Sequence, residues 1–240
     1  MIGKDTLIVI PARGGSKGIP NKNIRELAGK PLIYYTIDVA REIINEEFIC
    51  VSTDDDEIIK KVKEYGLDIP FKRPIELATD NSGMYEVLQH ALNFYEQRGY
   101  RFDCIILLQP TSPLRKPSHV IEAYKLFNDE IDMIVSVKES NANPYYNLYE
   151  EDENIYLRKS KQIAGLIRRQ DAPKVYQLNG SIYIIRVDSI KKYKSFEEFA
   201  KIKKYLMDEQ FSIDLDEPID WAFCEYLLIK GILTKNYHDL

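Results

Sequence analysis

Residues 6–23 read TLIVIPARGGSKGIPNKN. Their first part, Thr6–Ala12, is an apolar run broken by a proline, which predicts a buried strand. A polar loop, Arg13–Lys22, follows directly and contains three glycines, whose backbone N–H groups can approach a phosphate without interference from a Cβ. The arginine and lysines of this loop supply cations that can neutralise a triphosphate. The spacing matches neither a Walker A loop nor a dinucleotide-binding turn, and we interpret it as a phosphate-binding loop rather than a solvated surface loop.

Apolar strands and helices continue to alternate along the chain. Further strands are predicted at Phe48–Thr53, Asp103–Gln109, Met133–Val137 and Asn179–Val187. Helices are predicted at Pro31–Ile44, Asp55–Tyr65, Met84–Tyr95, His119–Phe127, Ser189–Tyr193 and, as an amphipathic helix, Ile219–Ile232. This alternation is typical of an α/β fold with a mainly parallel sheet covered on both faces. Such sheets bind ligands beyond the carboxyl ends of the strands, so we expect the site at the loops after Ala12, Thr53 and Gln109.

Length and charge narrow the class of protein. The 240 residues suit a single α/β domain, 1–240, with room for a small insertion. The net charge of −5 gives no indication of nucleic acid or membrane as a partner. Several cations nevertheless crowd into residues 1–30, a pattern that fits binding of a small anion.

Cysteine usage indicates the compartment. The three cysteines are Cys50, Cys104 and Cys224, and their odd number and wide spacing argue against a disulfide framework and a structural zinc site. The N-terminus lacks a signal-peptide pattern, and no apolar run approaches the ~20 residues of a transmembrane helix. We therefore expect a cytoplasmic protein.

The pattern changes over residues 140–177. Four tyrosines, Tyr145, Tyr146, Tyr149 and Tyr156, are interleaved with charged residues there, and no long helix is indicated. The segment fits either an antiparallel excursion or an arm that contacts a partner. Tyrosine is favoured in protein interfaces, which favours the second interpretation.

Two carboxylates stand two residues apart at Asp214 and Asp216. In an extended segment both point to one face while Leu215 turns toward the core. Paired carboxylate oxygens suit a hard cation such as Mg²⁺ or Mn²⁺. The alternative is a capping role for the helix that follows. At Asp54–Asp56 a helix cap is favoured over a metal site.

Gln109–Pro113 ends an apolar strand with an amide and two hydroxyls. This composition indicates recognition of a hydroxylated ligand, and the alternative is a rigid turn made by two prolines. The three histidines fall in no constellation with other catalytic groups. Since no Ser/His/Asp or Cys/His arrangement is evident, direct in-line transfer is favoured over a covalent route.

Residues 10–24, IPARGGSKGIPNKNI, resemble the signature of the cytidylyltransferases that make CMP-activated nine-carbon sugar acids, namely the CMP-sialic acid synthetases and their relatives for legionaminic and pseudaminic acids. The resemblance continues in order along nearly the whole chain. It includes GKPLI at 29–33, STDD at 52–55, RPIELA at 73–78, LQPTSPLR at 108–115, RQD at 169–171, NGSIY at 179–183 and DLD at 214–216. One departure is NPYYN at 143–147, where some sialic acid enzymes carry a lysine soon after the proline.

This resemblance implies a Rossmann-like α/β fold of the nucleotide-diphospho-sugar transferase type, with 140–177 as an inserted dimerisation segment. It implies a homodimer in which the segment around Arg169 reaches the partner's sugar site. The implied reaction couples CTP to a nine-carbon sugar acid, of the N-acetylneuraminate or legionaminate type, with Mg²⁺ or Mn²⁺ as cofactor. CMP-sugar and pyrophosphate would be the products.

The resemblance also assigns roles to residues. Nucleotide contacts fall on Ala12, Arg13, Gly14, Gly15, Lys22, Asn23, Arg73, Asn81 and Ser82. Sugar contacts fall on Gln109, Arg169, Asn179 and Tyr183, and metal contacts on Asp214 and Asp216. Catalysis would rest on Arg13, Lys22, Asp214 and Asp216.

Two alternatives stay open. One is a cytidylyltransferase for another sugar acid, such as pseudaminate or the eight-carbon acid Kdo. The other is a non-catalytic module that senses a nucleotide. The acidic pair at Asp214 and Asp216 counts against the second alternative, because nucleotide binding alone needs no such metal site.

Overall fold

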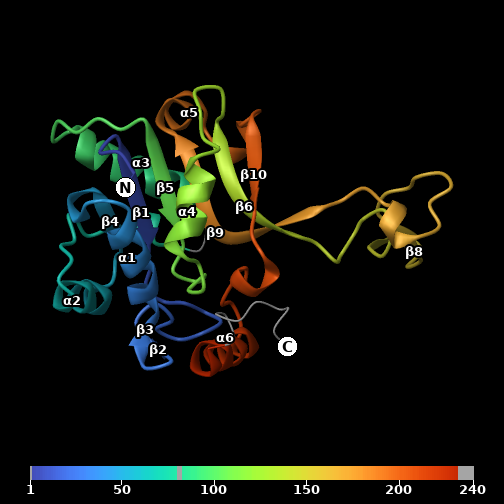
Figure 1. Ribbon diagram of the computed structural model, residues 1–240, viewed down its shortest axis with the longest axis horizontal. Coiled ribbons are helices and arrows are strands. Elements are labelled where there is room, and N and C mark those ends of the chain that lie inside the picture. The colour runs from blue at the N-terminus through green and yellow to red at the C-terminus, as the bar shows by residue number, and fades with distance from the viewer. Residues whose placement is uncertain (1, 80–82, 232–240) are drawn as a thin grey trace.

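The computed structural model describes residues 2–79 and 83–231, and a six-stranded sheet forms its centre (Figure 1). The strands are β1 Thr6–Pro11, β4 Ile49–Ser52, β5 Cys104–Leu108, β6 Met133–Glu139, β9 Tyr176–Arg186 and β10 Ile202–Leu206. Their order is β10-β6-β9-β5-β1-β4. Only β9 runs antiparallel to its neighbours among these six strands, which confirms the mainly parallel sheet.

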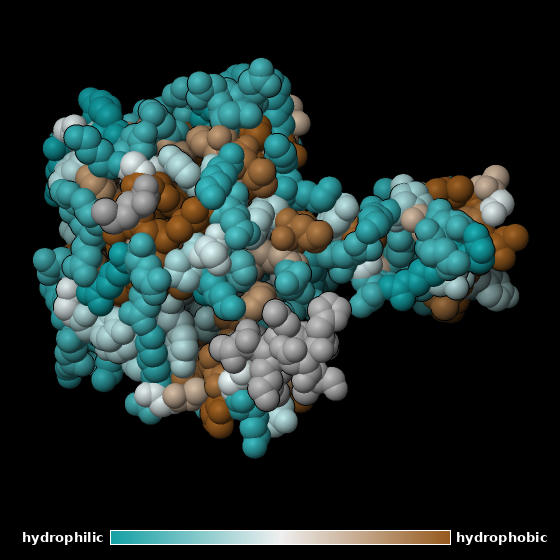
Figure 2. Space-filling view, viewed as in Figure 1, coloured by the Kyte–Doolittle hydropathy of each residue, from teal (hydrophilic) through white to brown (hydrophobic). Residues whose placement is uncertain are grey.

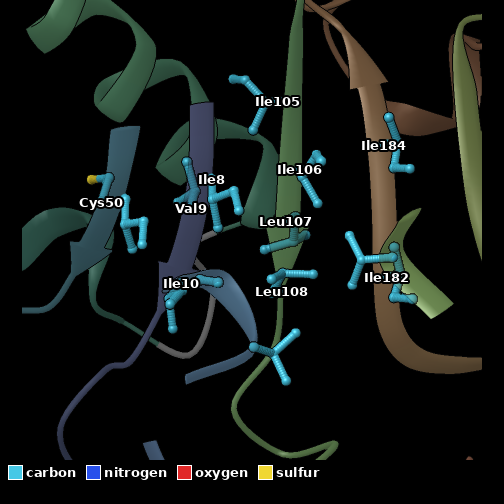
Figure 3. Packing of buried hydrophobic residues seen from close by; sticks show 14 of the residues in the cluster. Ile8, Val9, Ile10, Cys50, Ile105, Ile106, Leu107, Leu108, Ile182 and Ile184 are labelled. Carbon is cyan, nitrogen blue, oxygen red and sulfur yellow. The ribbon is translucent and has the colours of Figure 1, made fainter. Parts of the chain in front are cut away.

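The central strands are apolar on both faces because helices cover both. Every residue of β1, β4 and β5 is buried, and Figure 3 shows side chains from these strands and β9 packed in one core. The helices are α1 Leu32–Ile43, α2 Asp56–Glu64, α3 Met84–Glu96, α4 Pro117–Tyr124, α5 Val187–Lys192 and α6 Pro218–Lys230. α1 contacts α4, and Tyr85 of α3 donates a 2.8 Å hydrogen bond to the carbonyl of Ile190 in α5. None of the helices in the described ranges is long and apolar enough to cross a bilayer.

Residues between β6 and β9 form an arm that projects away from the body (Figure 1). It contains the hairpin of β7 Tyr149–Glu151 and β8 Leu157–Lys159 and the short helix η3 Arg169–Asp171. The segment thus contains an antiparallel hairpin, as the first of the two open interpretations expects. Figure 2 shows apolar side chains gathered on the arm, and Ile155 and Ile167 are 76% and 84% exposed.

Two features of the fold differ from the sequence-based expectation. Strand β10 was not predicted, because its sequence, IKKYL, does not alternate regularly between apolar and polar residues. The predicted amphipathic character of α6 is wrong. Trp221 and Cys224 are buried on one face, but Ile219, Phe223, Tyr226 and Ile229 are exposed on the other. A small hairpin of β2 Glu26–Leu27 and β3 Lys30–Pro31 also precedes α1.

Candidate active site

A cavity of about 410 Å³ lies beyond the carboxyl ends of β1 and β5, where the fold predicts a ligand. Arg13, Lys17 and Lys22 of the glycine-rich loop line one side. Gln109 and Thr111, which follow β5, line another. Arg73 and Asp216 complete the charged part of the wall. The cavity thus gathers cations, amide and hydroxyl groups, and one carboxylate from four distant parts of the sequence.

Contacts with the end of β4 hold the start of the glycine-rich loop. The Ala12 N–H donates to the Ser52 carbonyl at 2.9 Å, and the Gly14 N–H donates to Asp54 Oδ1 at 3.0 Å. A Cβ at Gly14 would stand 2.7 Å from Asp55 Oδ2, so this approach requires glycine. The Asn23 side chain is buried and donates to the Arg13 carbonyl at 3.0 Å, which fixes the far end of the loop.

Asp55 caps α2, because its Oδ1 accepts hydrogen bonds from the backbone N–H groups of Glu57 and Ile58 at 2.8 and 3.2 Å. The helix cap predicted within Asp54–Asp56 is thus confirmed at Asp55. Asp54 instead holds the glycine-rich loop, by accepting the hydrogen bond from the Gly14 N–H.

Arg73 is buried beside the cavity. Its Nε donates to Ser52 Oγ at 3.0 Å, and its guanidinium also donates to the Ser52 carbonyl. Burial lowers the pKa of Arg73 to about 10, and the nearby Asp54 opposes that shift. The residue therefore presents a partly desolvated cation to whatever occupies the cavity.

Lys22 joins the glycine-rich loop to the acidic pair. Its Nζ donates to the Leu215 carbonyl at 2.6 Å and to Asp216 Oδ1 at 3.2 Å. The Leu215 N–H donates to the Thr111 carbonyl at 2.9 Å, so the same segment is also tied to the loop after β5. Leu215 is fully buried, as the alternating pattern predicted.

The capping role considered for the acidic pair belongs to another residue. Asp220 Oδ2 accepts hydrogen bonds from the backbone N–H groups of Asp216 and Glu217 at 3.1 and 2.8 Å, at the start of α6. These two N–H groups at the start of α6 are thus bound by Asp220 and not by the carboxylates of Asp214 and Asp216.

The acidic pair fits a magnesium ion. Asp214 Oδ1 is buried and has no hydrogen-bond partner among residues 2–79 and 83–231. Burial raises the pKa of Asp214, the Thr111 hydroxyl opposes this shift, and the charge of Asp216 adds to it. Within the described residues no group of three or more His, Cys, Asp or Glu side chains is placed to hold a metal. Mg²⁺ commonly takes only one or two carboxylates and completes its shell with water and substrate phosphates, so two aspartates are sufficient.

Gln109, Gly180 and Tyr183 lie on the Asp214 side of the site. Gly180 has a φ of +68°, and a Cβ there would stand 2.8 Å from Asp214 Oδ2 and 3.4 Å from Gln109 Oε1. Burial raises the pKa of the half-buried Tyr183, and the charge of Asp214 raises it further. The structure therefore brings Gly180 and Gln109 together with Asp214, one of the two proposed metal ligands.

Asn179 is placed differently. Its buried Oδ1 accepts from Ser136 Oγ at 2.6 Å and from the Ser181 N–H at 3.2 Å, while its Nδ2 donates to Ser212 Oγ at 2.9 Å. A direct contact with a sugar would require these bonds to break. The geometry instead supports a positioning role, in which Asn179 fixes the backbone that leads into Gly180.

Three other candidates, Arg169, Ala12 and Gly15, are not among the described residues that line the cavity. Arg169 belongs to η3 in the arm, where its guanidinium donates to Asn141 Oδ1, and it is not among the described residues that line the cavity. Asn81 and Ser82 lie outside the described residues. Ala12 directly precedes the glycine-rich loop, and Gly15 of that loop lines a second, adjoining cavity of about 620 Å³.

Sequence reasoning missed the role of Arg115, although it stands in the segment 108–115. Its side chain is buried, and its Nη1 donates to the carbonyls of Ser181 and Gln109 at 2.7 and 3.3 Å. Nη2 donates to Thr36 Oγ1 of α1 at 2.8 Å. Burial lowers the pKa of Arg115. This guanidinium therefore joins β5, β9 and α1 directly behind the site.

Comparison of the sequence with known proteins shows the family to which the chain belongs. A family profile described as cytidylyltransferase matches residues 7–235. The chain is 39% identical over 222 residues to the CMP-N,N'-diacetyllegionaminic acid synthase of Legionella pneumophila, covering 92% of this chain and 95% of that enzyme. It is 35% identical over 218 residues to the N-acylneuraminate cytidylyltransferase of Streptococcus agalactiae serotype V, of which the matched region covers 51%, against 90% of this chain.

The fold is shared with solved structures. A CMP:2-keto-3-deoxy-manno-octonic acid synthetase complexed with CTP superposes with a TM-score of 0.67 at 19% identity, covering 94% of this chain and 99% of that one. At this identity the likeness concerns the fold alone. The sequence matches go further, and the chain belongs to the cytidylyltransferase family.

Proposed function

We propose that this cytidylyltransferase couples CTP to a nonulosonic acid of the legionaminate or N-acetylneuraminate type, forming the CMP-sugar and pyrophosphate. The observation that carries the proposal is the cavity in which phosphate-binding cations, the Gln109 amide and the carboxylate of Asp216 converge. The sequence matches to a diacetyllegionaminic acid synthase and an N-acylneuraminate cytidylyltransferase support the substrate class.

The proposed reaction is an in-line attack by the anomeric hydroxyl of the sugar acid on the α-phosphorus of CTP. The oxygen–phosphorus bond to the sugar forms as the bond to pyrophosphate breaks. Arg13, Lys22 and backbone N–H groups of the glycine-rich loop, other than the Gly14 N–H that donates to Asp54, would hold the phosphates and stabilise charge on the leaving group. Arg73 would add a desolvated positive charge near the nucleotide.

Asp214 and Asp216 would hold Mg²⁺ or Mn²⁺, which supplies charge neutralisation at the phosphate oxygens and makes the attacking hydroxyl more acidic. Gln109 and Tyr183 would orient the sugar on the adjoining side, with Gly180 leaving room for the Asp214 carboxylate. Asn179 would act from behind by fixing the backbone at Gly180.

We further propose that the active form is a homodimer joined through the arm, residues 140–177. The arm exposes apolar side chains that its own body leaves uncovered, including Ile155, Leu157 and Ile167 at 76%, 67% and 84%. Such an exposed apolar surface is typical of an interface. In this arrangement Arg169, which stands on the arm, would serve the sugar site of the other protomer.

The test is a pyrophosphate-release assay with CTP, Mg²⁺ and a panel of sugar acids. The panel contains N,N'-diacetyllegionaminate, N-acetylneuraminate, pseudaminate and Kdo. Release with either of the first two, and CMP-sugar identified by mass spectrometry, is the expected result. Release only with pseudaminate or Kdo would reassign the substrate, and no release with any acid would reject the function.

A further inference from the structure

Lys22 is held in an unusual position for a residue assigned to phosphate binding. Its side chain is only 13% exposed, whereas the side chain of its partner Asp216 is 72% exposed. The position of the ammonium is also fixed by the backbone, because Lys22 Nζ donates a hydrogen bond to the Leu215 carbonyl at 2.6 Å. The Lys22–Asp216 ion pair is therefore held in one geometry on its lysine side, unlike an ion pair between two mobile surface side chains.

The glycine-rich loop rests on the same acidic segment. A Cβ at Gly18 would stand 2.3 Å from the Asp216 carbonyl oxygen, so the two backbones are in direct contact. Gly18, Lys22 and Asp216 all line the cavity in which the phosphates are proposed to bind. The loop and the acidic segment thus form one unit, and Lys22 supplies its ionic contact.

Each charged group in this unit has two possible partners. The Asp216 carboxylate can bind either the Lys22 ammonium or a divalent cation. The Lys22 ammonium can bind either Asp216 or the oxygens of a triphosphate in the same cavity. Asp214, by contrast, keeps a buried Oδ1 without a hydrogen-bond partner among the described residues, and so remains poised for a cation.

We propose that Lys22 occupies the place of a cation at the acidic pair until the nucleotide draws it away, so that nucleotide and divalent metal bind with positive coupling. This inference rests on the proposed function, because it takes the nucleotide to be the anion that recruits Lys22. Without nucleotide, a metal ion must displace the ammonium and binds weakly. With nucleotide, Lys22 turns to the phosphates and Asp216 is released. Coupling between two ligands is reciprocal and typically amounts to about 5–150-fold in affinity.

The decisive measurement is Mn²⁺ affinity of the nucleotide-free protein, followed by the electron paramagnetic resonance signal of free Mn²⁺. Lys22→Met removes the competing ammonium, and we expect it to bind Mn²⁺ about fivefold or more tightly than the unchanged protein. Lys22→Arg keeps a cation at this place and should bind Mn²⁺ as the unchanged protein does. Lys17→Met removes one positive charge from the same loop and cavity, and should change the affinity less than twofold.

Two results would overturn the inference: unchanged or weaker Mn²⁺ binding by Lys22→Met, or an equal gain in Lys17→Met, which would show a general field effect. Thermal unfolding checks that the variants fold, and Lys22→Gln replaces Lys22→Met if the latter does not. The measurement needs neither sugar nor turnover. A failed pyrophosphate assay with tightened Mn²⁺ binding would therefore reject the proposed function but keep the competition at Asp216, and the reverse outcome would do the opposite.

Discussion

The Asp214 carboxylate lies against the bare Cα of Gly180: a Cβ at position 180 would stand 2.8 Å from Asp214 Oδ2. The φ of +68° at Gly180 is a second reason for glycine there, since side chains rarely adopt this conformation. The contact joins the proposed metal side of the site to the sugar side on β9. Position 180 is therefore restricted both by its backbone conformation and by its close approach to Asp214.

Gly180→Ala is expected to lose Mg²⁺-dependent turnover as well as stability. The added methyl group must push the Asp214 carboxylate aside, and the left-handed backbone costs about 1–2 kcal/mol. Gly99→Ala is the matched control, because Gly99 has a φ of +89° but a Cβ there meets none of the described atoms within 4 Å. Urea unfolding should show a comparable loss in both variants, while a Mg²⁺ titration of turnover should separate them. Equal activity in the two variants would refute a role for the Gly180–Asp214 contact.

Asp214→Asn and Asp216→Asn should each reduce turnover by two orders of magnitude or more, roughly 3 kcal/mol in the barrier, because an amide is a poorer ligand for Mg²⁺. Binding of CTP without metal should be unchanged or tighter, since a negative charge that repels the triphosphate is gone. Isothermal titration calorimetry and steady-state kinetics measure the two effects. Full Mg²⁺-dependent activity in both variants would show that the metal binds elsewhere.

The same two variants should differ in stability. The raised pKa of Asp214 means that the native state binds its proton more tightly than the unfolded chain, so stability falls as pH rises through that pKa. Above that pKa the ionised, half-buried carboxylate therefore costs stability, and Asp214→Asn should raise the Tm of the metal-free protein there. Asp216 is 72% exposed and pairs with Lys22, so Asp216→Asn should not. In a pH series of thermal unfolding, the Tm gain of Asp214→Asn over the unchanged protein should therefore grow as pH rises through that pKa, and a lowered Tm in this variant would contradict the sign.

Lys22→Ala should remain folded and lose about 2–4 kcal/mol of transition-state stabilisation, because one charged contact to the phosphates is removed. Lys30→Ala is the control. It removes a lysine whose partner, Asp38, stands in α1. Steady-state kinetics and circular dichroism together decide the matter, and near-normal turnover in a folded Lys22→Ala would reject the assignment.

Mixing two inactive variants tests whether sites are shared between protomers. If Arg169 serves the partner's site, Lys22→Ala and Arg169→Ala should together restore activity in mixed dimers. Lys22→Ala mixed with Asp216→Asn should not, because these residues form an ion pair within one chain and each mixed site would lack one of them. Light scattering establishes the assembly. A monomer, or no restoration despite proven subunit exchange, would count against the shared site.

Much of the fold could be predicted from local pattern. β1 and α1 follow from an apolar run and from helical spacing, and their observed bounds differ from the predicted ones by a residue or two. The incorrect predictions concern β10 and α6, whose conformation or burial depends on contacts with other parts of the fold. The residues of β10 are largely exposed, and their strand conformation comes from pairing with β6. α6 turns an apolar face outward that periodicity alone would place in a core.

For the candidate site, the sequence pattern indicated some residues and not others. Loop cations and the Asp214–Asp216 pair carry their chemistry in their spacing, and the structure brings them together. The hydrogen bonds of Asn179 could not be predicted, because the hydroxyls that engage its amide come from Ser136 and Ser212 on other segments. Arg115 gave no signal of its position, since an arginine in sequence is normally taken to be exposed. Only the tertiary arrangement shows it buried behind β5 and β9.

The bond between Lys22 and Asp216 spans 194 positions of sequence. Contacts of such separation carry a high loop-closure cost, and they form slowly compared with helices and neighbouring strands. During synthesis or refolding, β1, α1 and β4 can assemble while the glycine-rich loop still lacks the segment on which it rests. We therefore expect recovery of turnover during refolding to lag behind recovery of secondary structure.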